Sequence, residues 1–318
     1  MKQRGQIRTQ LSMRSAVLLM AAVSVARGSS FIFSKQLLAG GMEPLNLLGV
    51  RSLIAFAVLM LFFWRRVIAS VRADHHNLTA GMLIGFVYFL VMTLELNGLK
   101  YTNATTASFL ENSAIVLVPL GEMIIFRRLL TGKALMCCAL SLTGIGFIAA
   151  KGFVRGLGTG EFLCIAAAVL YTAAIIITDR AAKKYDPFVV GILYVGAMGA
   201  FGLAGSFATE TPHLPQTGSQ WLMILMLAVV CSSFGFAMQP VAQKTISSET
   251  AGILIALNPL TTAVLGITVL SETFGMNDII GAALIIGGIA LHNMPEEREK
   301  AGLLSNLSGM YLNRRIYK

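Results

Sequence analysis

The stretch TTASFLENSAIVLVPL, residues 105–120, returns in weaker form as ETAGILIALNPLTTAV, residues 249–264. The two stretches align without gaps, and each is an apolar run that contains a proline, Pro119 in the first and Pro259 in the second. The Glu111 carboxylate of the first has no counterpart in the second, because Ile255 stands where it would repeat. An internal repeat of this kind predicts a chain built from two related halves.

The composition indicates an integral membrane protein. The chain has 318 residues, of which 56% are hydrophobic and 13% are charged, with a mean hydropathy of +0.74. A typical soluble domain is about 25% charged. The net charge of +10 would favour a nucleic-acid partner in a soluble protein, but cytoplasmic loops of membrane proteins collect Lys and Arg. We therefore expect a lipid bilayer and no nucleic acid as partners.

Ten segments are long and apolar enough to span a bilayer. The sequence thus predicts an all-α integral membrane fold with ten transmembrane helices. They cover residues 15–39, 45–64, 80–99, 103–126, 133–151, 159–178, 187–208, 219–239, 248–270 and 276–293. Basic residues concentrate in alternate loops and in both tails, which predicts that both termini are cytoplasmic.

The division of the chain follows from these spans. We expect a cytoplasmic N-terminus over 1–14, a first five-helix repeat over 15–151, a second over 159–293 and a cytoplasmic tail over 294–318. Five is an odd number, so the second repeat must enter the membrane from the opposite side. Inverted repeats are typical of transporters, which bind substrate near the midplane between the repeats. Pro119 and Pro259 predict helix breaks in the equivalent fourth and ninth spans, although ordinary kinks would explain them equally well.

The sequence resembles the EamA-type transporters of the drug/metabolite transporter superfamily. The resemblance rests on EPLNLLGVRSLIAF at 43–56, GLKYTNATTASFL at 98–110 and AGILIALNPLTTAVLGITVLSETFGMNDIIGAALIIGGIAL at 251–291. The last stretch includes the Ser271-Glu272 step that is similar to the family pattern. The first half departs there, because Arg128 stands at the position equivalent to Glu272. The resemblance implies export or exchange of small metabolites by alternating access, in a bacterial inner (plasma) membrane.

Ionisable residues inside spans are rare and usually functional. Counted at about 1.5 Å per residue, Arg27, Arg51, Glu95 and Glu111 lie at depths that would let them meet in the external half of one cavity. Two interpretations stay open. Arginine–glutamate pairs would fix helix packing, or Glu111 would stand in an aqueous cavity and exchange a coupling proton or bind a cation.

Further polar candidates lie near these charges. They are Asn112, Tyr171 and Asn258, and Tyr171 is the repeat partner of Arg27. Gln239 is interpreted as an interhelical hydrogen-bonding residue. Glycines recur at 196, 199, 202 and 205, which predicts close packing of the seventh span.

These features favour a secondary transporter of a small zwitterionic or cationic solute, amino-acid or amine-like. Two alternatives remain: an antiporter of sugar phosphates or nucleotide sugars, which would need several basic residues in the cavity, and a lipid-modifying membrane enzyme. Four cysteines lie inside apolar segments without metal-ligand spacing, and no nucleotide-binding motif occurs. The sequence therefore predicts no cofactor, no metal and no enzyme activity, and no feature assigns an oligomeric state.

Overall fold

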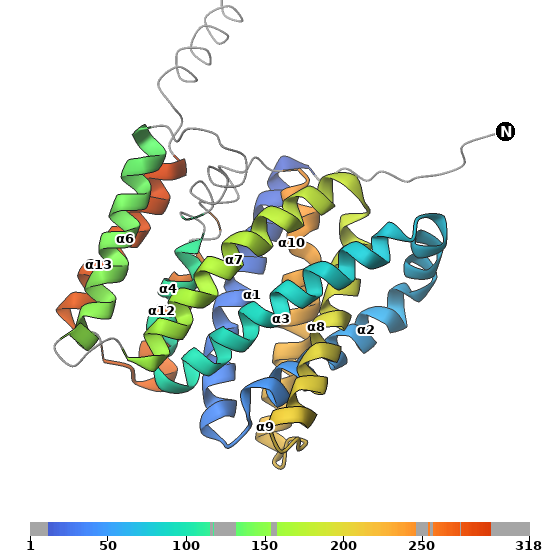
Figure 1. Ribbon diagram of the computed structural model, residues 1–318, viewed down its shortest axis with the longest axis horizontal. Coiled ribbons are helices and arrows are strands. Elements are labelled where there is room, and N and C mark those ends of the chain that lie inside the picture. Colours follow the sequence, from blue (N-terminus) through green and yellow to red (C-terminus); the bar gives the residue numbers. More distant parts are fainter. Residues whose placement is uncertain are drawn as a thin grey trace, which may run out of the picture.

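The protein is a bundle of helices (Figure 1). The computed structural model describes residues 12–114, 117, 132–153, 158–245, 254, 257–273 and 275–293, and no strand occurs within them. The helices are α1 (Met13–Ala39), α2 (Pro44–Ala73), α3 (His76–Tyr101), α4 (Ala104–Asn112), α6 (Gly132–Phe153), α7 (Thr159–Lys184), α8 (Pro187–Thr209), α9 (Gly218–Leu225), the π-helix η1 (Met226–Phe234), α10 (Gly235–Gln243), α12 (Leu257–Leu270) and α13 (Met276–Asn293). The all-α prediction is confirmed for these residues. The fourth and ninth spans extend beyond them, so ten spans remain a prediction.

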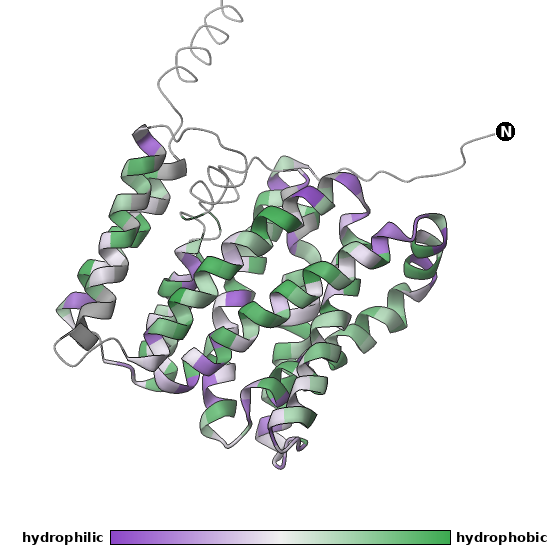
Figure 2. Cartoon of the chain, viewed as in Figure 1, coloured by the Kyte–Doolittle hydropathy of each residue, from purple (hydrophilic) through white to green (hydrophobic). Residues whose placement is uncertain are grey.

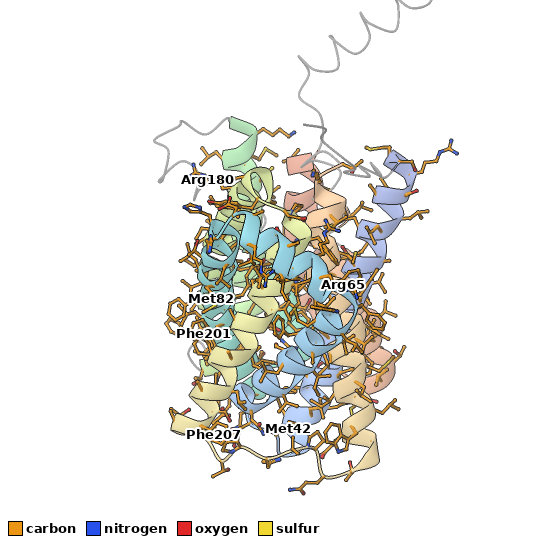
Figure 3. The ribbon with its side chains drawn as sticks, turned by 90° about the vertical axis from the view of Figure 1, so that its right-hand side faces the viewer. Met42, Arg65, Met82, Arg180, Phe201 and Phe207 are labelled. Atoms are coloured by element: carbon orange, nitrogen blue, oxygen red, sulfur yellow. The ribbon has the colours of Figure 1, made fainter. Side chains whose placement is uncertain are left out.

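Six helical segments are long and apolar enough to cross a membrane. They are α1, α2, α3, Thr159–Ala182 of α7, α8, and the segment Gly218–Gln239 that begins with α9. Their outward surface is apolar, since Leu18, Leu61, Phe62 and Phe207 are each at least 70% exposed. Figure 2 shows the hydrophobic colour along the helix bodies and hydrophilic residues mainly at their ends. Figure 3 places Arg180 at the opposite end of the bundle from Met42 and Phe207. An apolar outer surface along the helix bodies is expected where side chains contact lipid.

Helix starts follow local sequence signals. The second span of each half begins at a proline, Pro44 in α2 and Pro187 in α8. Proline suits the first helical position, because its missing N–H would have no helical partner there. The Asp186 carboxylate also accepts the backbone N–H of Phe188 and caps α8. Several helices are longer than the apolar segments predicted for them, since α2 continues to Ala73 and α7 to Lys184.

Equivalent spans of the two halves lie against each other in the bundle. The described parts of the equivalent spans pack against each other: α2 against α8, α4 against α12, and α6 against α13. Several other contacts also come in matched sets, since α3 packs on α7 as α10 packs on α1, and α7 packs on α4 as α1 packs on α12. Replacing each helix by its equivalent in the other half converts one contact of a set into the other contact of that set. A pseudo-two-fold arrangement of the two halves accounts for this pattern.

Glycines bring α2 and α8 into close contact, as the glycine stripe predicts. A Cβ at Gly202 would lie 3.0 Å from the Gly49 nitrogen, and one at Gly199 would lie 2.9 Å from the Leu53 nitrogen. A Cβ at Gly196 would lie 2.6 Å from the Phe56 ring. Small residues at these positions therefore let the two backbones approach, which is how helices pack in membranes.

The eighth span contains a π-helical segment that the sequence did not predict. It begins as α9, passes through η1 over Met226–Phe234 and ends as α10. Such segments are rare and often occur at functional sites. This one places Cys231 and Ser232 on the central cavity.

Candidate functional site

A small cavity lies in the middle of the bundle between α1, α2, α3, α4, η1 and α10. Its lining includes the four ionisable residues singled out in the sequence, Arg27, Arg51, Glu95 and Glu111. The complete lining also contains Ser30, Phe31, Met92, Cys231, Ser232 and Phe236. The cavity has room for about one water molecule. The structure therefore shows a conformation that is closed around these charges.

All four charged side chains are buried, with exposures of 8% for Arg27, 2% for Arg51, 3% for Glu95 and 2% for Glu111. Within the described part of the chain, no ion pair joins either arginine to either glutamate. Ion pairs elsewhere in the bundle include Arg66–Asp186, His76–Asp74 and Lys100–Glu43, whose side chains are at least partly exposed. The pairing of Glu111 with an arginine, considered from the sequence, is thus not the arrangement observed.

The two carboxyl groups instead face each other. Glu95 from α3 and Glu111 from α4 lie within hydrogen-bonding range of one another. Oε2 of each is buried and has no hydrogen-bond partner among the described residues. Two carboxyl groups form a hydrogen bond only when at least one of them carries a proton. The structure therefore brings the two candidate carboxyl groups of the sequence analysis together in one cavity.

Arg27 contacts an amide oxygen and two aromatic rings. Its Nη1 donates to Oε1 of Gln239 at 2.7 Å, so the interpretation of Gln239 as an interhelical bonding residue is confirmed. Its guanidinium carbon lies 5.4 Å from the ring centre of Tyr171 and 4.9 Å from that of Phe236. Both are within the range of cation–π attraction. Arg27 and Tyr171, which are repeat partners in sequence, therefore meet in space.

An aromatic cluster adjoins the Arg27 guanidinium. Tyr88 stacks on Tyr194 with ring centres 5.1 Å apart, and the Tyr194 hydroxyl donates to the Phe236 carbonyl at 3.0 Å. Tyr88 also contacts Tyr171 edge-on at 6.0 Å. Tyr88 lies seven residues before Glu95 on α3, about 10 Å along the helix axis toward its N-terminus. Phe236 connects this cluster to the cavity, because it also lines the cavity.

The hydrogen-bond acceptors of Arg51 are weaker than the amide oxygen that Arg27 contacts. Its Nη1 donates to the Ser34 hydroxyl at 3.3 Å and its Nη2 points to the Met92 sulfur at 3.0 Å. Its Nε has no partner among the described residues. The sequence analysis did not identify Met92 or Ser34. Met92 lies three residues before Glu95 and so shares its helix face, and this spacing is the only sequence signal for it.

The two asparagines of the candidate set contact each other across the repeat. Asn258 donates from Nδ2 to Oδ1 of Asn112 at 3.1 Å, and Asn112 donates to the Ser108 carbonyl at 2.8 Å. Thr262 adds contacts to the Ser108 hydroxyl at 3.0 Å and to the Gly28 carbonyl at 2.8 Å. These bonds join α4 to α12 and α12 to α1. They lie where the two halves meet.

Of the two prolines that predict helix breaks, only Pro259 lies within the described residues. Pro259 is buried in the first turn of α12, whereas Pro119 lies outside the described residues.

Away from the cavity, Asp74 stands in the turn between α2 and α3. Hydrogen bonds from the His76 backbone and ring lower the pKa of the Asp74 carboxyl. No group of three or more His, Cys, Asp or Glu side chains in the described ranges could hold a metal ion.

Glu272 connects the second half to the helix that carries Glu111. Its carboxylate accepts the backbone N–H of Ala104 at 2.6 Å, the backbone N–H of Thr105 at 3.2 Å and the Thr105 hydroxyl at 2.7 Å. It therefore caps the N-terminus of α4, where a negative charge is favourable. Ser271 precedes it with a φ of 54°, a left-handed conformation that turns the chain directly after α12.

Replacing Glu272 with alanine is expected to destabilise the protein by about 1.5–3 kcal/mol, the usual effect of losing hydrogen bonds to a charged group. Thermal unfolding in detergent measures this. The matched control is Glu43→Ala, since Glu43 forms an exposed pair with Lys100. An exposed pair contributes at most about 1 kcal/mol. Equal stability of the two variants would contradict the capping role.

Comparisons with known proteins agree with this architecture. The sequence profile of the EamA-like transporter family matches residues 14–150 and again residues 158–294. A crystal structure of another protein has a TM-score of 0.65 to this one at 19% sequence identity, and the match covers 88% of this chain and 97% of that one. At this identity the structural likeness shows a shared fold alone.

Two relatives match over most of their length. An uncharacterized transporter of Archaeoglobus fulgidus is 28% identical over 285 residues, which covers 86% of this chain and 96% of the relative. The uncharacterized inner membrane transporter YicL of Salmonella typhimurium is 25% identical over 300 residues, which covers 90% and 98%. The family match takes in both halves of the chain. This multi-pass membrane protein therefore belongs to the EamA-like transporter family.

Proposed function

We propose that this transporter is a secondary carrier that exports or exchanges a small amino-acid or amine-like solute, zwitterionic or cationic, by alternating access. The observation that carries the proposal is the Glu95–Glu111 pair in a buried cavity. A cationic group of the solute and a proton would compete for the same two carboxyl groups. Such competition couples solute movement in one direction to proton movement in the other.

The size of the cavity supports alternating access. Room for about one water molecule is too little for a metabolite, so solute entry requires the bundle to open. The cluster of Tyr88, Tyr171, Tyr194 and Phe236 would form the closure on one side, since Phe236 also lines the cavity. At the end of the bundle where α3 ends and α4 begins, Glu272 of the second half binds the N-terminus of α4 in the first half. Opening one closure at a time would expose the carboxyl pair to one side of the membrane.

The topology belongs to the same proposal. We infer inverted repeats over 15–151 and 159–293 and cytoplasmic termini from the odd number of predicted spans and the basic loops. The relative YicL is described as an inner membrane transporter, which supports the same location for this chain. A sugar-phosphate antiporter is less well supported, because Gln239 and two aromatic rings already engage Arg27.

Counterflow in proteoliposomes tests the proposal. Purified protein is first screened by thermal shift against the standard amino acids, putrescine, UDP-glucose and glucose 6-phosphate. The compounds that stabilise it are then used as labelled external solute against unlabelled internal solute. We expect transient accumulation of an amino acid or amine, with a rate that depends on pH. Stabilisation by the phosphates alone, or no exchange by any stabilising compound, would contradict the proposal.

A further inference from the structure

The two buried arginines of the cavity differ in how their guanidinium groups are satisfied. A guanidinium has five N–H donors. Arg27 directs one donor to the Gln239 amide oxygen at 2.7 Å and places its charge beside two aromatic rings. Arg51 is 98% buried, yet its acceptors are one hydroxyl at 3.3 Å and one thioether sulfur at 3.0 Å. Its Nε has no partner in the described part of the chain.

This arrangement leaves the Arg51 charge poorly compensated. A methionine sulfur is only a weak acceptor, and hydrogen bonds between a guanidinium and a carboxylate are roughly twice as strong as bonds between neutral groups. The carboxylates that share the cavity, Glu95 and Glu111, form no ion pair with Arg51. A buried arginine of this kind therefore presents unused donors to the cavity.

We propose that Arg51 is the receptor for a carboxylate group of the solute. This inference rests on the proposed transport function and specifies its substrate class: the solute carries a carboxylate, with or without an amine. A carboxylate can accept two parallel bonds from one guanidinium, which no present partner of Arg51 does. Met92 is suited to making room, because its side chain has three rotatable bonds and packs adaptably.

The geometry divides the cavity into two poles. Arg51 on α2 provides the anion-binding pole, and the Glu95–Glu111 pair on α3 and α4 provides the proton- or cation-binding pole. Ser34 of α1 accepts a bond from Arg51 in the observed structure. Displacement of the Met92 sulfur is the local change that carboxylate binding requires.

The test compares acids with their amides. The probes are alanine, leucine and phenylalanine, their three carboxamides, and propionate as a carboxylate without an amine. The readout is the methyl signal of Met92 in protein labelled with [ε-13C]methionine, assigned by its absence in Met92→Leu. We expect at least one acid to shift this signal while its amide does not. A shift from propionate would show that the amine is dispensable, whereas a shift from amino acids only would show that both poles are needed.

Variants distinguish the contribution of Arg51 to acid binding from that of Arg27. Arg51→Lys keeps the charge but loses the fork of donors, and we expect affinity for the acids to fall about 10- to 100-fold with little change for the amides. Arg27→Lys is the matched control and should keep the preference for acids. Met92→Leu keeps Arg51 and removes the competing sulfur, so thermal shift should show acid binding at least as strong as in the unmodified protein.

Three results would overturn the proposal: no acid shifts the Met92 signal, acids and amides shift it equally, or Met92→Leu loses the preference for acids. Failure of the transport function is distinguishable. Acid-selective binding without counterflow would leave Arg51 as a carboxylate site and contradict transport. Equal counterflow of acids and amides would support transport and contradict the role of Arg51.

Discussion

Glu111→Gln is expected to reduce proton-dependent transport by about tenfold or more, a free-energy effect of at least about 1.4 kcal/mol. Glutamine has nearly the same shape as a protonated glutamate and can still donate a hydrogen bond to Glu95. It cannot release a proton, so the pair would stay locked in the proton-loaded form. Counterflow or proton-driven uptake over a range of pH values measures the effect, and the variant's rate should vary much less with pH.

Controls separate this effect from loss of fold. Glu111→Gln should be purified in normal yield with unchanged thermal stability, because its side chain fits the same space. Glu43→Gln removes a carboxylate at an exposed pair with Lys100 and should transport normally. Transport by Glu111→Gln at the unmodified rate and with unmodified pH dependence would exclude this residue from coupling.

Gly28→Val should have the largest effect on assembly. A Cβ at Gly28 would overlap with the Asn258 carbonyl oxygen and lie 2.8 Å from Thr261 Cβ, so α1 and α12 cannot keep their spacing. Separating them would also break the Thr262–Gly28 bond of 2.8 Å. Because the overlap is with backbone, we expect destabilisation of about 3 kcal/mol or more, at or above the usual range for overpacking.

The yield of monodisperse protein and the unfolding temperature in detergent measure this change. The control is Gly287→Val in α13, which also places valine within a helix but meets no atom within 4 Å. Normal stability of Gly28→Val would show that the contact between α1 and α12 is looser than the structure indicates.

Hydropathy and repeat alignment predicted the features that depend on local chemistry. Apolar runs located the described helices, and the predicted starts of the second and seventh spans at residues 45 and 187 agree with α2 and α8 to within one residue. The depth count also placed Arg27, Arg51, Glu95 and Glu111 at depths that would let them meet, and the structure brings them to one cavity. Helix lengths were less predictable, because hydropathy marks the bilayer core whereas α2 and α7 continue beyond it.

The partners of these charges could not be predicted from sequence. Whether Arg27 bonds to Glu111 or to Gln239 depends on how far each helix is rotated about its axis, and hydropathy does not define that rotation. The repeat alignment also gave no role for Glu272, because Arg128 stands at the equivalent position. Its contact with α4 depends on the left-handed turn at Ser271, a single backbone angle that no periodic pattern reports.

The contact between Arg27 and Tyr171 bears on the history of the chain. Two identical copies of one half, assembled as a dimer about a two-fold axis, would bring either two arginines or two tyrosines together at this place. Two cations would repel there, and two phenols would leave the site without a charge. A cation resting on an aromatic ring requires the copies to differ, and therefore requires them to be encoded separately. The single chain meets this requirement, since each half has its own coding sequence and mutation can change one side of the axis without altering the other.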